Sequence, residues 1–245
     1  MTAALLLHRA DGGRPSCTFQ PAAFGTSDPW AAAREIAWQG PGAMCAGRIT
    51  LSGEIDVAQH PHTEIWVVVD GELSLRAPGS PARVLGRGEA AVIARGTALQ
   101  VQVRGRAVVG FCAFEAQAGT PASPAGPAGI TALHAQADFK PSSPPAAHLL
   151  LGPTPQCRSD NVFHDEAAAV QAGTWDSTPY HRIVRPHPVN EFMFLLAGRV
   201  HFASPDGSVL EAGPGDAVFV PHGTPIGWES RETVAKFYLV QSLPA

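Results

Sequence analysis

The residues best suited to chemistry in the first half of the chain are two histidines and a glutamate, His60, His62 and Glu64. Their spacing places all three side chains on one side of a regular strand, because successive side chains alternate between its faces. Two imidazoles and a carboxylate on one face can form a facial site for a divalent transition metal. The sequence therefore predicts a metal site, with Mn, Fe, Ni or Zn as the candidate cofactor. The alternative is that both histidines lie at the rim of the fold and bind nothing.

A different chemistry is indicated in the second half of the chain. Arg185 shares its strand parity with His181 and His187. Glu191 lies four residues after His187. An arginine disfavours a metal cation and favours a carboxylate or a phosphate, because its guanidinium is a permanent cation that donates paired hydrogen bonds. Two aromatic residues from neighbouring strands are expected to add an apolar wall. The predicted ligand pocket consists of His181, Arg185, His187, Glu191, Trp228 and Tyr238.

A purely structural role for the same residues stays open. Arg185 can pair with Glu191 as a structural ion pair, since buried carboxylates usually have partners, and Trp228 can be an ordinary core residue. No order of serine, histidine and aspartate, and no cysteine–histidine pair, marks a catalytic nucleophile. Catalytic residues are therefore left unassigned.

Lys236 alternates with apolar and aromatic residues, which is compatible with an inward side chain. Inward lysines are rare and are usually paired or functional. An ion pair with Asp216 or Glu229 is the ordinary explanation for such a lysine.

The elements expected to position these residues are short strands. Apolar runs such as Ile65–Val69, Phe192–Leu196 and Ala217–Val220 are too short to cross a membrane and are typical of buried strands. Glycine, proline and aspartate interrupt the chain at regular intervals, as in all-β barrels and sandwiches. The segment 30–38 fits a short helix and a strand equally well.

The chain repeats itself at an offset of 127 residues without a gap between His60 and Thr97. A repeat of this length indicates two whole domains and not the units of a solenoid, whose periods are about 20–50 residues. Residues 116–129 are rich in proline, glycine and alanine, which is typical of a linker. We therefore expect an N-terminal domain at 1–115, a linker at 116–129 and a C-terminal domain at 130–245.

The second half also carries a family resemblance, which runs from Thr174 to Tyr238. Glu191 followed by Gly198 resembles the end of the first cupin motif, and Gly215-Asp216 with Pro221-x-Gly223 resembles the second. The continuation through Trp228 is similar to the cupin_3 subgroup, also known as DUF861, a domain of unknown function. The resemblance implies an all-β bicupin, with two RmlC-like cupin barrels (double-stranded β-helix or jelly-roll) in one chain. It also implies a homodimer and pairing of the inter-barrel segment with the partner barrel's sheet.

Metal-binding cupins use two histidines, a glutamate and a third histidine from the second motif. In the N-terminal half, the resemblance places Ala58 and Leu99 at the first and last of these positions. In the C-terminal half it places Arg185 and Ile226 there. The subgroup is similar to ureidoglycine aminohydrolase, a manganese bicupin, but that enzyme's ligand set does not map onto either half.

Composition excludes several classes of partner. The formal net charge is −4 and no cluster of lysine or arginine stands out, so neither nucleic acid nor an anionic membrane surface is expected to bind. The four cysteines are scattered, without zinc spacing, as in a reduced cytoplasmic protein. No apolar run approaches the length of a membrane span.

Three functions remain, and the first is the one we expect. It is a cytoplasmic bicupin that binds a small anionic, carboxylate-like metabolite in a barrel pocket, with catalysis left open. The second is a metal-dependent hydrolase or dioxygenase with its metal in the N-terminal barrel. The third is a metal-free isomerase or epimerase that uses a histidine–tyrosine pair such as His181 with Tyr180 or Tyr238.

Overall fold

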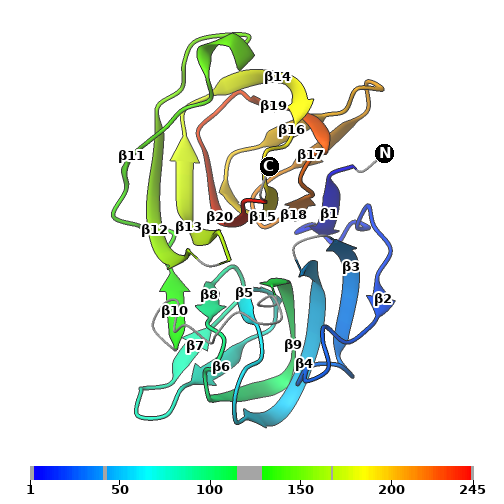
Figure 1. Cartoon of the computed structure of the whole chain (residues 1–245), viewed down its shortest axis with the longest axis vertical. Coiled ribbons are helices and arrows are strands. Elements are labelled where there is room, and N and C mark those ends of the chain that lie inside the picture. The colour runs from blue at the N-terminus through cyan, green and yellow to red at the C-terminus, as the bar shows by residue number, and fades with distance from the viewer. Residues whose placement is uncertain (1–2, 41–42, 115–128, 167, 244–245) are drawn as a thin grey trace. The chain divides into compact units, whose positions relative to one another are not determined.

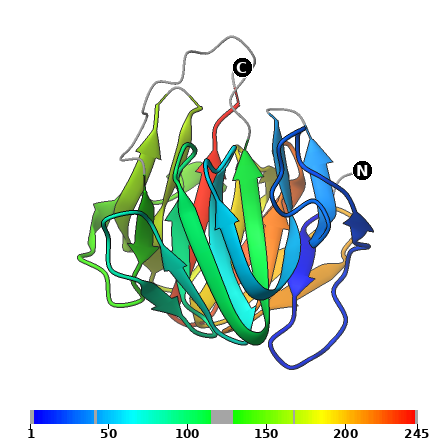
Figure 2. The ribbon, with the colours of Figure 1, turned by 90° about the horizontal axis from the view of Figure 1, so that it is seen from below.

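The computed structural model describes residues 3–40, 43–114, 129–166 and 168–243 (Figures 1 and 2). The described chain is built from β-strands, and its one helical element is the 3-10 turn η1 (Ala147–Leu149). No helix within these ranges is long and apolar enough to cross a membrane. The ambiguous segment near residue 30 forms a turn followed by a strand. The predicted linker lies, apart from Gly129, outside the described residues.

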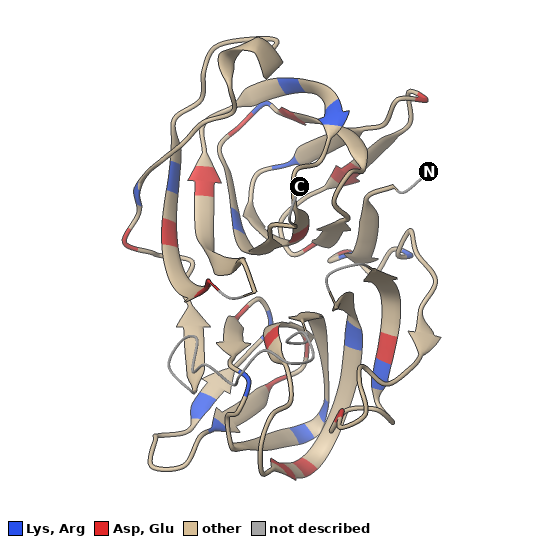
Figure 3. Cartoon of the chain, viewed as in Figure 1, with Lys and Arg blue, Asp and Glu red and all other residues tan. Residues whose placement is uncertain are grey.

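The chain separates into two compact units. The N-terminal unit comprises Cys17–Leu133 and Phe163–Ala168, and the C-terminal unit comprises Met1–Ser16, His134–Val162 and Ala169–Ala245. Within each unit, acidic and basic residues are interspersed along the strands (Figure 3).

The N-terminal unit contains one nine-stranded sheet with the order β10-β8-β5-β9-β4-β3-β2, in which β6 pairs with β7 and β9. Its core includes Trp30, Trp66 and Phe111, all fully buried. The strands of this sheet are β2 (Gln20–Pro21), β3 (Arg34–Gly40), β4 (Met44–Val57), β5 (Thr63–Asp70), β6 (Leu73–Arg76), β7 (Arg83–Leu85), β8 (Ala90–Ile93), β9 (Leu99–Phe114) and β10 (Ile130–Leu133).

The C-terminal unit contains a seven-stranded sheet, β1-β18-β15-β20-β13-β12-β11, and a four-stranded sheet, β14-β19-β16-β17. Its core includes Met193, Phe202 and Trp228. The strands are β1 (Leu5–His8), β11 (Lys140–Ser142), β12 (Cys157–Asp165), β13 (Val170–Ser177), β14 (Tyr180–Pro186), β15 (Asn190–Ala197), β16 (Val200–Ala203), β17 (Val209–Ala212), β18 (Ala217–Val220), β19 (Pro225–Ser230) and β20 (Val234–Gln241).

The strands follow the sequence repeat closely. Strands β5 and β15, β6 and β16, and β8 and β18 each begin and end 127 residues apart. The repeated glycines Gly71 and Gly198 both have positive φ, at 77° and 70°. A Cβ at either position would lie 2.3 Å from a backbone carbonyl oxygen, so only glycine allows these chains to approach so closely. The repeat in sequence is therefore a repeat in structure.

Each unit obtains one edge strand from a distant part of the chain. Strand β1 pairs with β18, and β10 pairs with β8, its counterpart in the repeat. The Asp216 carboxylate holds the end of β1 by accepting hydrogen bonds from the Ala10 amide at 2.8 Å and the Arg9 guanidinium at 3.3 Å. The compact units therefore place β1 with the second half of the sequence and β10 with the first. The domain boundaries given above remain a prediction.

The packing of β1 into the C-terminal core gives a prediction about stability. Leu6 is 1% exposed and belongs to that core. We expect Leu6→Ala to lower the free energy of unfolding by about 2–4 kcal/mol in urea titrations, because it leaves a cavity. The same change at Leu151, which is 61% exposed, should cost less than about 0.5 kcal/mol. Equal losses for the two variants would contradict the placement of β1.

Candidate functional site

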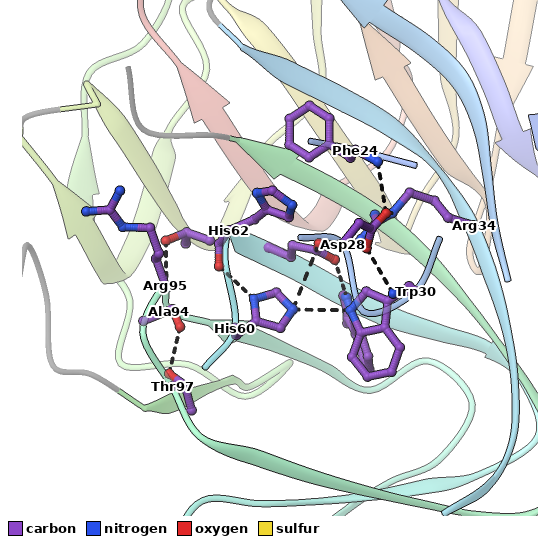
Figure 4. Close-up of polar contacts among 12 residues, drawn as sticks. Phe24, Asp28, Trp30, Arg34, His60, His62, Ala94, Arg95 and Thr97 are labelled. Atoms are coloured by element: carbon purple, nitrogen blue, oxygen red, sulfur yellow. Dashed lines mark hydrogen bonds and ion pairs between the residues drawn. The ribbon is translucent and has the colours of Figure 1, made fainter. Parts of the chain in front are cut away.

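His60 and His62 lie just before β5 in the N-terminal unit (Figure 4). Glu64 is the second residue of β5, and all three side chains are buried. The chain at His60 is anchored on both sides. Its amide donates to the carbonyl of Thr97, and its carbonyl accepts from the amide of Gly96. The sequence thus identified three residues that are close in space.

The partners of Glu64 are the unexpected feature. Its Oε1 accepts a hydrogen bond from Nη2 of Arg34 at 2.6 Å, and its Oε2 accepts one from Nε1 of Trp66 at 2.7 Å. Arg34 also donates from Nε and Nη2 to the two oxygens of Asp28 at 2.7 and 3.0 Å. The side chains of all three charged residues are fully buried. Two carboxylates therefore share one guanidinium in the interior.

Electrostatic interactions keep Asp28, Arg34 and Glu64, the Arg34 triad, charged. Burial by itself would raise the pKa of Glu64, but the Arg34 guanidinium lowers it below its ordinary value. Burial likewise opposes the charged form of Arg34, and Glu64 and Asp28 together raise its pKa well above the ordinary value. The guanidinium also lies 4.3 Å from the centre of the Phe111 ring. The cation is thus held by charge, hydrogen bonds and an aromatic face.

Of the two histidines, His60 has a hydrogen-bond partner for each ring nitrogen, whereas both buried ring nitrogens of His62 have none among the described residues. Nδ1 of His60 lies 2.7 Å from the carbonyl oxygen of His62, and its Nε2 accepts from Nε1 of Trp30 at 3.2 Å. A carbonyl can only accept, so the proton of His60 lies on Nδ1. The ring of His62 packs against Phe24, with ring centroids 4.7 Å apart. Burial, as the largest influence, lowers the pKa of His62 and favours its neutral form.

These contacts do not fit a divalent metal. Both oxygens of Glu64 and both ring nitrogens of His60 are engaged with protein groups. Nowhere in the described ranges do three histidine, cysteine, aspartate or glutamate side chains form a group that could hold a metal ion. A guanidinium occupies the position beside Glu64 that a bound cation would need. We therefore derive no chemistry through a metal in this unit.

In the C-terminal unit, the predicted inward residues of β14 need a correction. Tyr180, Arg182 and Arg185 lie opposite Ser230, Trp228 and Ile226 of β19, and the register shifts between Arg182 and Arg185. Residues opposite one another in an antiparallel pair share a face, and Trp228 and Ile226 are buried.

Arg182 and Arg185 therefore both face the interior, whereas His181 is exposed and lies opposite Glu229. The irregularity after Arg182 changes the parity of the strand, so the prediction that His181 faces inward was wrong.

Glu191 is the centre of the C-terminal cluster. Its Oε1 accepts from Nζ of Lys236 at 2.7 Å, and its Oε2 lies 2.9 Å from Nε2 of His187. Burial would raise the pKa of Glu191, but Lys236 first and then His187 lower it far below the ordinary value. The carboxylate is therefore ionised at neutral pH. The partner of Lys236 is Glu191, and not Asp216 or Glu229 as the sequence suggested.

Aromatic rings surround this ion pair. The Lys236 ammonium lies 4.8 Å from the ring centre of Trp175 and 5.1 Å from that of Trp228. Tyr180 stacks on Trp228 with centroids 5.5 Å apart. The Tyr238 hydroxyl donates to Oδ1 of Asn161, and burial, with smaller contributions from Glu191 and Asp160, raises its pKa to about 12. Trp228 is thus a core residue, and Trp175 is the partly exposed member of the group.

Neither of the two interior arginines has a carboxylate partner in the part of the chain that the structure describes. Arg182 donates from Nη2 to the carbonyl of Ile226 at 3.4 Å, and its buried Nε has no hydrogen-bond partner among the described residues. Arg185 donates from Nε to the carbonyl of Pro186 at 3.2 Å. Burial, with repulsion from Arg185, lowers the pKa of Arg182, although Tyr180 and Glu191 act in the opposite direction. The alternative ion pair between Arg185 and Glu191 is not formed in this structure.

The structure thus brings together His187, Glu191 and Trp228, places Tyr238 beside them and leaves His181 outside. Arg182 and Arg34 were not predicted from the sequence. The strand irregularity that turns Arg182 inward leaves no mark in the sequence. Arg34 lies 30 residues before Glu64, in the segment whose structure was ambiguous, so no local pattern connects the two.

Comparison with known proteins supports one family. Residues 164–238 match a family model described as an EutQ-like cupin domain. A protein of unknown function from Pseudomonas syringae pv. tomato, described as a member of the DUF861 family, has a solved structure that is 38% identical and covers 98% of this chain and 100% of its own, with a TM-score of 0.91.

More distant structures share the fold. One is a cupin 2 conserved barrel domain protein from Leptotrichia buccalis, which is 10% identical to this chain with a TM-score of 0.57. The match covers 84% of this chain and 87% of that protein. Another is the protein Ylba from E. coli, also described as DUF861, which is 11% identical with a TM-score of 0.54. The match covers 97% of this chain and 89% of that protein. No curated protein matches the sequence.

The Arg34 triad gives a prediction about stability. Arg34→Gln leaves Asp28 and Glu64 buried without their cation, so we expect it to lower the free energy of unfolding by about 3–5 kcal/mol. The control is Arg48→Gln, which breaks a pair with Glu35 in which both side chains are partly exposed and should cost less than about 1 kcal/mol. Urea unfolding measures both. A loss for Arg34→Gln no larger than the control's would show that the triad is not a structural ion pair.

The lowered pKa of Glu191 gives a prediction about pH. The ordinary pKa of 4.5 is lowered on folding, so the stability from this carboxylate is complete above 4.5 and is lost as pH falls through the folded value. We expect the free energy of unfolding to decrease more steeply between about pH 5 and pH 3 in the wild type than in Glu191→Gln. The exposed Glu232, changed to Gln, should leave the wild-type slope unaltered. Equal slopes for all three proteins would contradict the account.

Proposed function

This chain belongs to the DUF861 family of cupin proteins, and from that premise we propose that it binds a small anionic metabolite without a metal. The proposed pocket lies in the C-terminal unit, and the two units are proposed to be two cupin barrels of one bicupin. The ligand is carboxylate-like, and no catalytic residue is assigned. The observation that carries the proposal is the pair of interior arginines, Arg182 and Arg185.

Among the described residues of the cluster, the two arginines are the cations that lack an anionic partner. Lys236 and His187 already contact Glu191. The described structure gives neither Arg182 nor Arg185 an ion pair, and the buried Nε of Arg182 has no partner. A carboxylate fits this arrangement, because guanidinium groups bind it through paired, charge-assisted hydrogen bonds. Such a ligand would supply both the hydrogen bonds and the charge that the protein leaves open.

The aromatic residues define the rest of the pocket. Trp175 is partly exposed and lies edge to face with Trp228, with centroids 6.1 Å apart. Trp175 can therefore offer an apolar contact to the carbon skeleton of a bound metabolite. A mainly apolar surface with a few placed polar groups is the usual composition of a small-molecule site.

The metal-dependent alternative has less support in either unit. In the N-terminal unit, a guanidinium neutralises Glu64. In the C-terminal unit, both oxygens of Glu191 are engaged. The two remaining cupin ligand positions are Arg185, a cation, and Ile226, which offers no lone pair.

The isomerase alternative requires an acid and a base on opposite sides of one substrate. Tyr180 and His181 do not provide this arrangement, because His181 is exposed on the outer face. Tyr180 is stacked on Trp228, and burial raises its pKa well above the ordinary value. Deprotonation of this tyrosine is therefore disfavoured.

We also propose a cytoplasmic location and a homodimer. All four cysteines are free and three of them are buried, which supports a reducing compartment. The homodimer rests on the family resemblance alone.

The proposal predicts a defined pattern of affinities. Isothermal titration calorimetry with small mono- and dicarboxylates, in the presence of a chelator, should detect binding to the wild type. Arg182→Gln and Arg185→Gln should each weaken it by about 10–100-fold, since each removes a charge-assisted contact. The control is Arg231→Gln, whose side chain is 82% exposed and pairs with Glu229, and it should bind like the wild type.

Two results would overturn the proposal. The first is binding that disappears in chelator and returns with a divalent metal. The second is affinity that is unaffected in both interior arginine variants while their circular dichroism and thermal melting show a folded protein.

A further inference from the structure

We infer that the ligand of the C-terminal unit carries two negative charges, as in a dicarboxylate or a phosphate monoester. This inference rests on the proposed anion pocket and deepens it by specifying the charge of the ligand. It rests on the charged side chains that face the interior of the unit and on those among them that the protein already neutralises.

The first cation, Lys236, is fully satisfied. Its ammonium donates to Glu191 at 2.7 Å, lies 3.2 Å from the sulfur of Met193 and contacts the faces of Trp175 and Trp228. Its side chain is 8% exposed. A lysine with these contacts neutralises Glu191 and leaves little room to bind a ligand directly.

The second and third cations are not neutralised. Arg182 and Arg185 share the face of β14 that lies over Trp228 and Ile226, and Arg182 interacts electrostatically with both Arg185 and Glu191. The electrostatic neighbours of Arg182 are Tyr180, Arg185 and Glu191, and the only carboxylate among them is the one that Lys236 already contacts. Two positive charges are therefore left in excess.

Other acidic residues near the cluster are engaged elsewhere. Glu229 lies opposite the exposed His181 and pairs with Arg231. Asp176 pairs with Arg158 through two hydrogen bonds. Asp160 accepts from the backbone amide of Asp138 and acts electrostatically on Tyr238. None of the three forms an ion pair with Arg182 or Arg185 in the described structure.

A ligand with one charge would leave one of the arginines unneutralised in a partly buried setting. Two like charges that face one interior repel each other, and a ligand with two charges removes that repulsion while it satisfies both guanidinium groups. The site should therefore distinguish a dianion from a monoanion of the same shape. This expectation separates the inference from the simpler proposal that an anion binds.

The test compares dicarboxylates with their monoamides, which keep the size but lose one charge. The pairs are malonate with malonamate, succinate with succinamate and glutarate with glutaramate, measured by calorimetry on the full chain in chelator. Methyl phosphate at about pH 8, above the second phosphate pKa of about 6, tests whether both charges can lie on one group. We expect at least one dianion to bind about tenfold or more tightly than its monoamide.

The variants show which residues cause this preference. Arg182→Gln and Arg185→Gln should each reduce the ratio of dianion to monoamide affinity towards one, whereas Arg231→Gln should keep the wild-type ratio. If a glutamine variant does not fold, the lysine variant at the same position keeps the charge and should keep most of the preference.

The outcomes separate the two proposals. If dicarboxylates and monoamides bind equally well, and methyl phosphate no more tightly than either, the dianion inference is wrong and the anion pocket stands. If methyl phosphate alone binds tightly, the ligand is a dianion of the phosphate type. If no anion binds, both the pocket and the inference are wrong.

Discussion

A carboxylate buried inside a β-sheet protein needs a positive partner, because an isolated buried charge is strongly unfavourable. This constraint is met twice in the chain, at repeat positions 127 residues apart, and the two solutions differ. Glu64 is neutralised by Arg34 from β3, and Glu191 is neutralised by Lys236 from β20 together with His187. In both units, a cation of the protein occupies the surroundings of the glutamate, where metal-binding cupins place a metal ion. The cation that neutralises the glutamate determines which other charged groups of that unit remain available.

In the N-terminal unit, the cation of this network already has carboxylate partners. Arg34 is shared by two carboxylates, and the tryptophans Trp30 and Trp66 complete the hydrogen bonds of His60 and Glu64. The charged side chains of this network are fully buried, as expected of a structural element, and among the described residues Nη1 of Arg34 has no hydrogen-bond partner. In the C-terminal unit the lysine neutralises the glutamate one to one, so the arginines on β14 remain available. The two units therefore differ in whether a cation near the buried glutamate is left without a carboxylate partner among the described residues.

The sequence predicted much of this arrangement. The repeat offset, the short strands and the pairing of His60 with Glu64 and of His187 with Glu191 in space all follow from spacing and turn chemistry. Two kinds of information were missing. The position of Arg182 depends on an irregularity in β14 that moves the side chains from one face to the other, and no residue type marks it. The contacts of Arg34 and Lys236 with glutamates 30 and 45 residues away depend on which strands lie side by side.

The central claim is that protein cations, and not metals, neutralise both buried glutamates, and that the arginines of β14 bind the anion. The most direct measurement is anomalous X-ray diffraction from crystals grown with manganese and soaked with a bromine-substituted dicarboxylate. The account predicts a bromine peak beside Arg182 and Arg185 and no manganese peak at Glu64 or Glu191. A manganese peak between His187 and Glu191, with Lys236 displaced from the carboxylate, would contradict it.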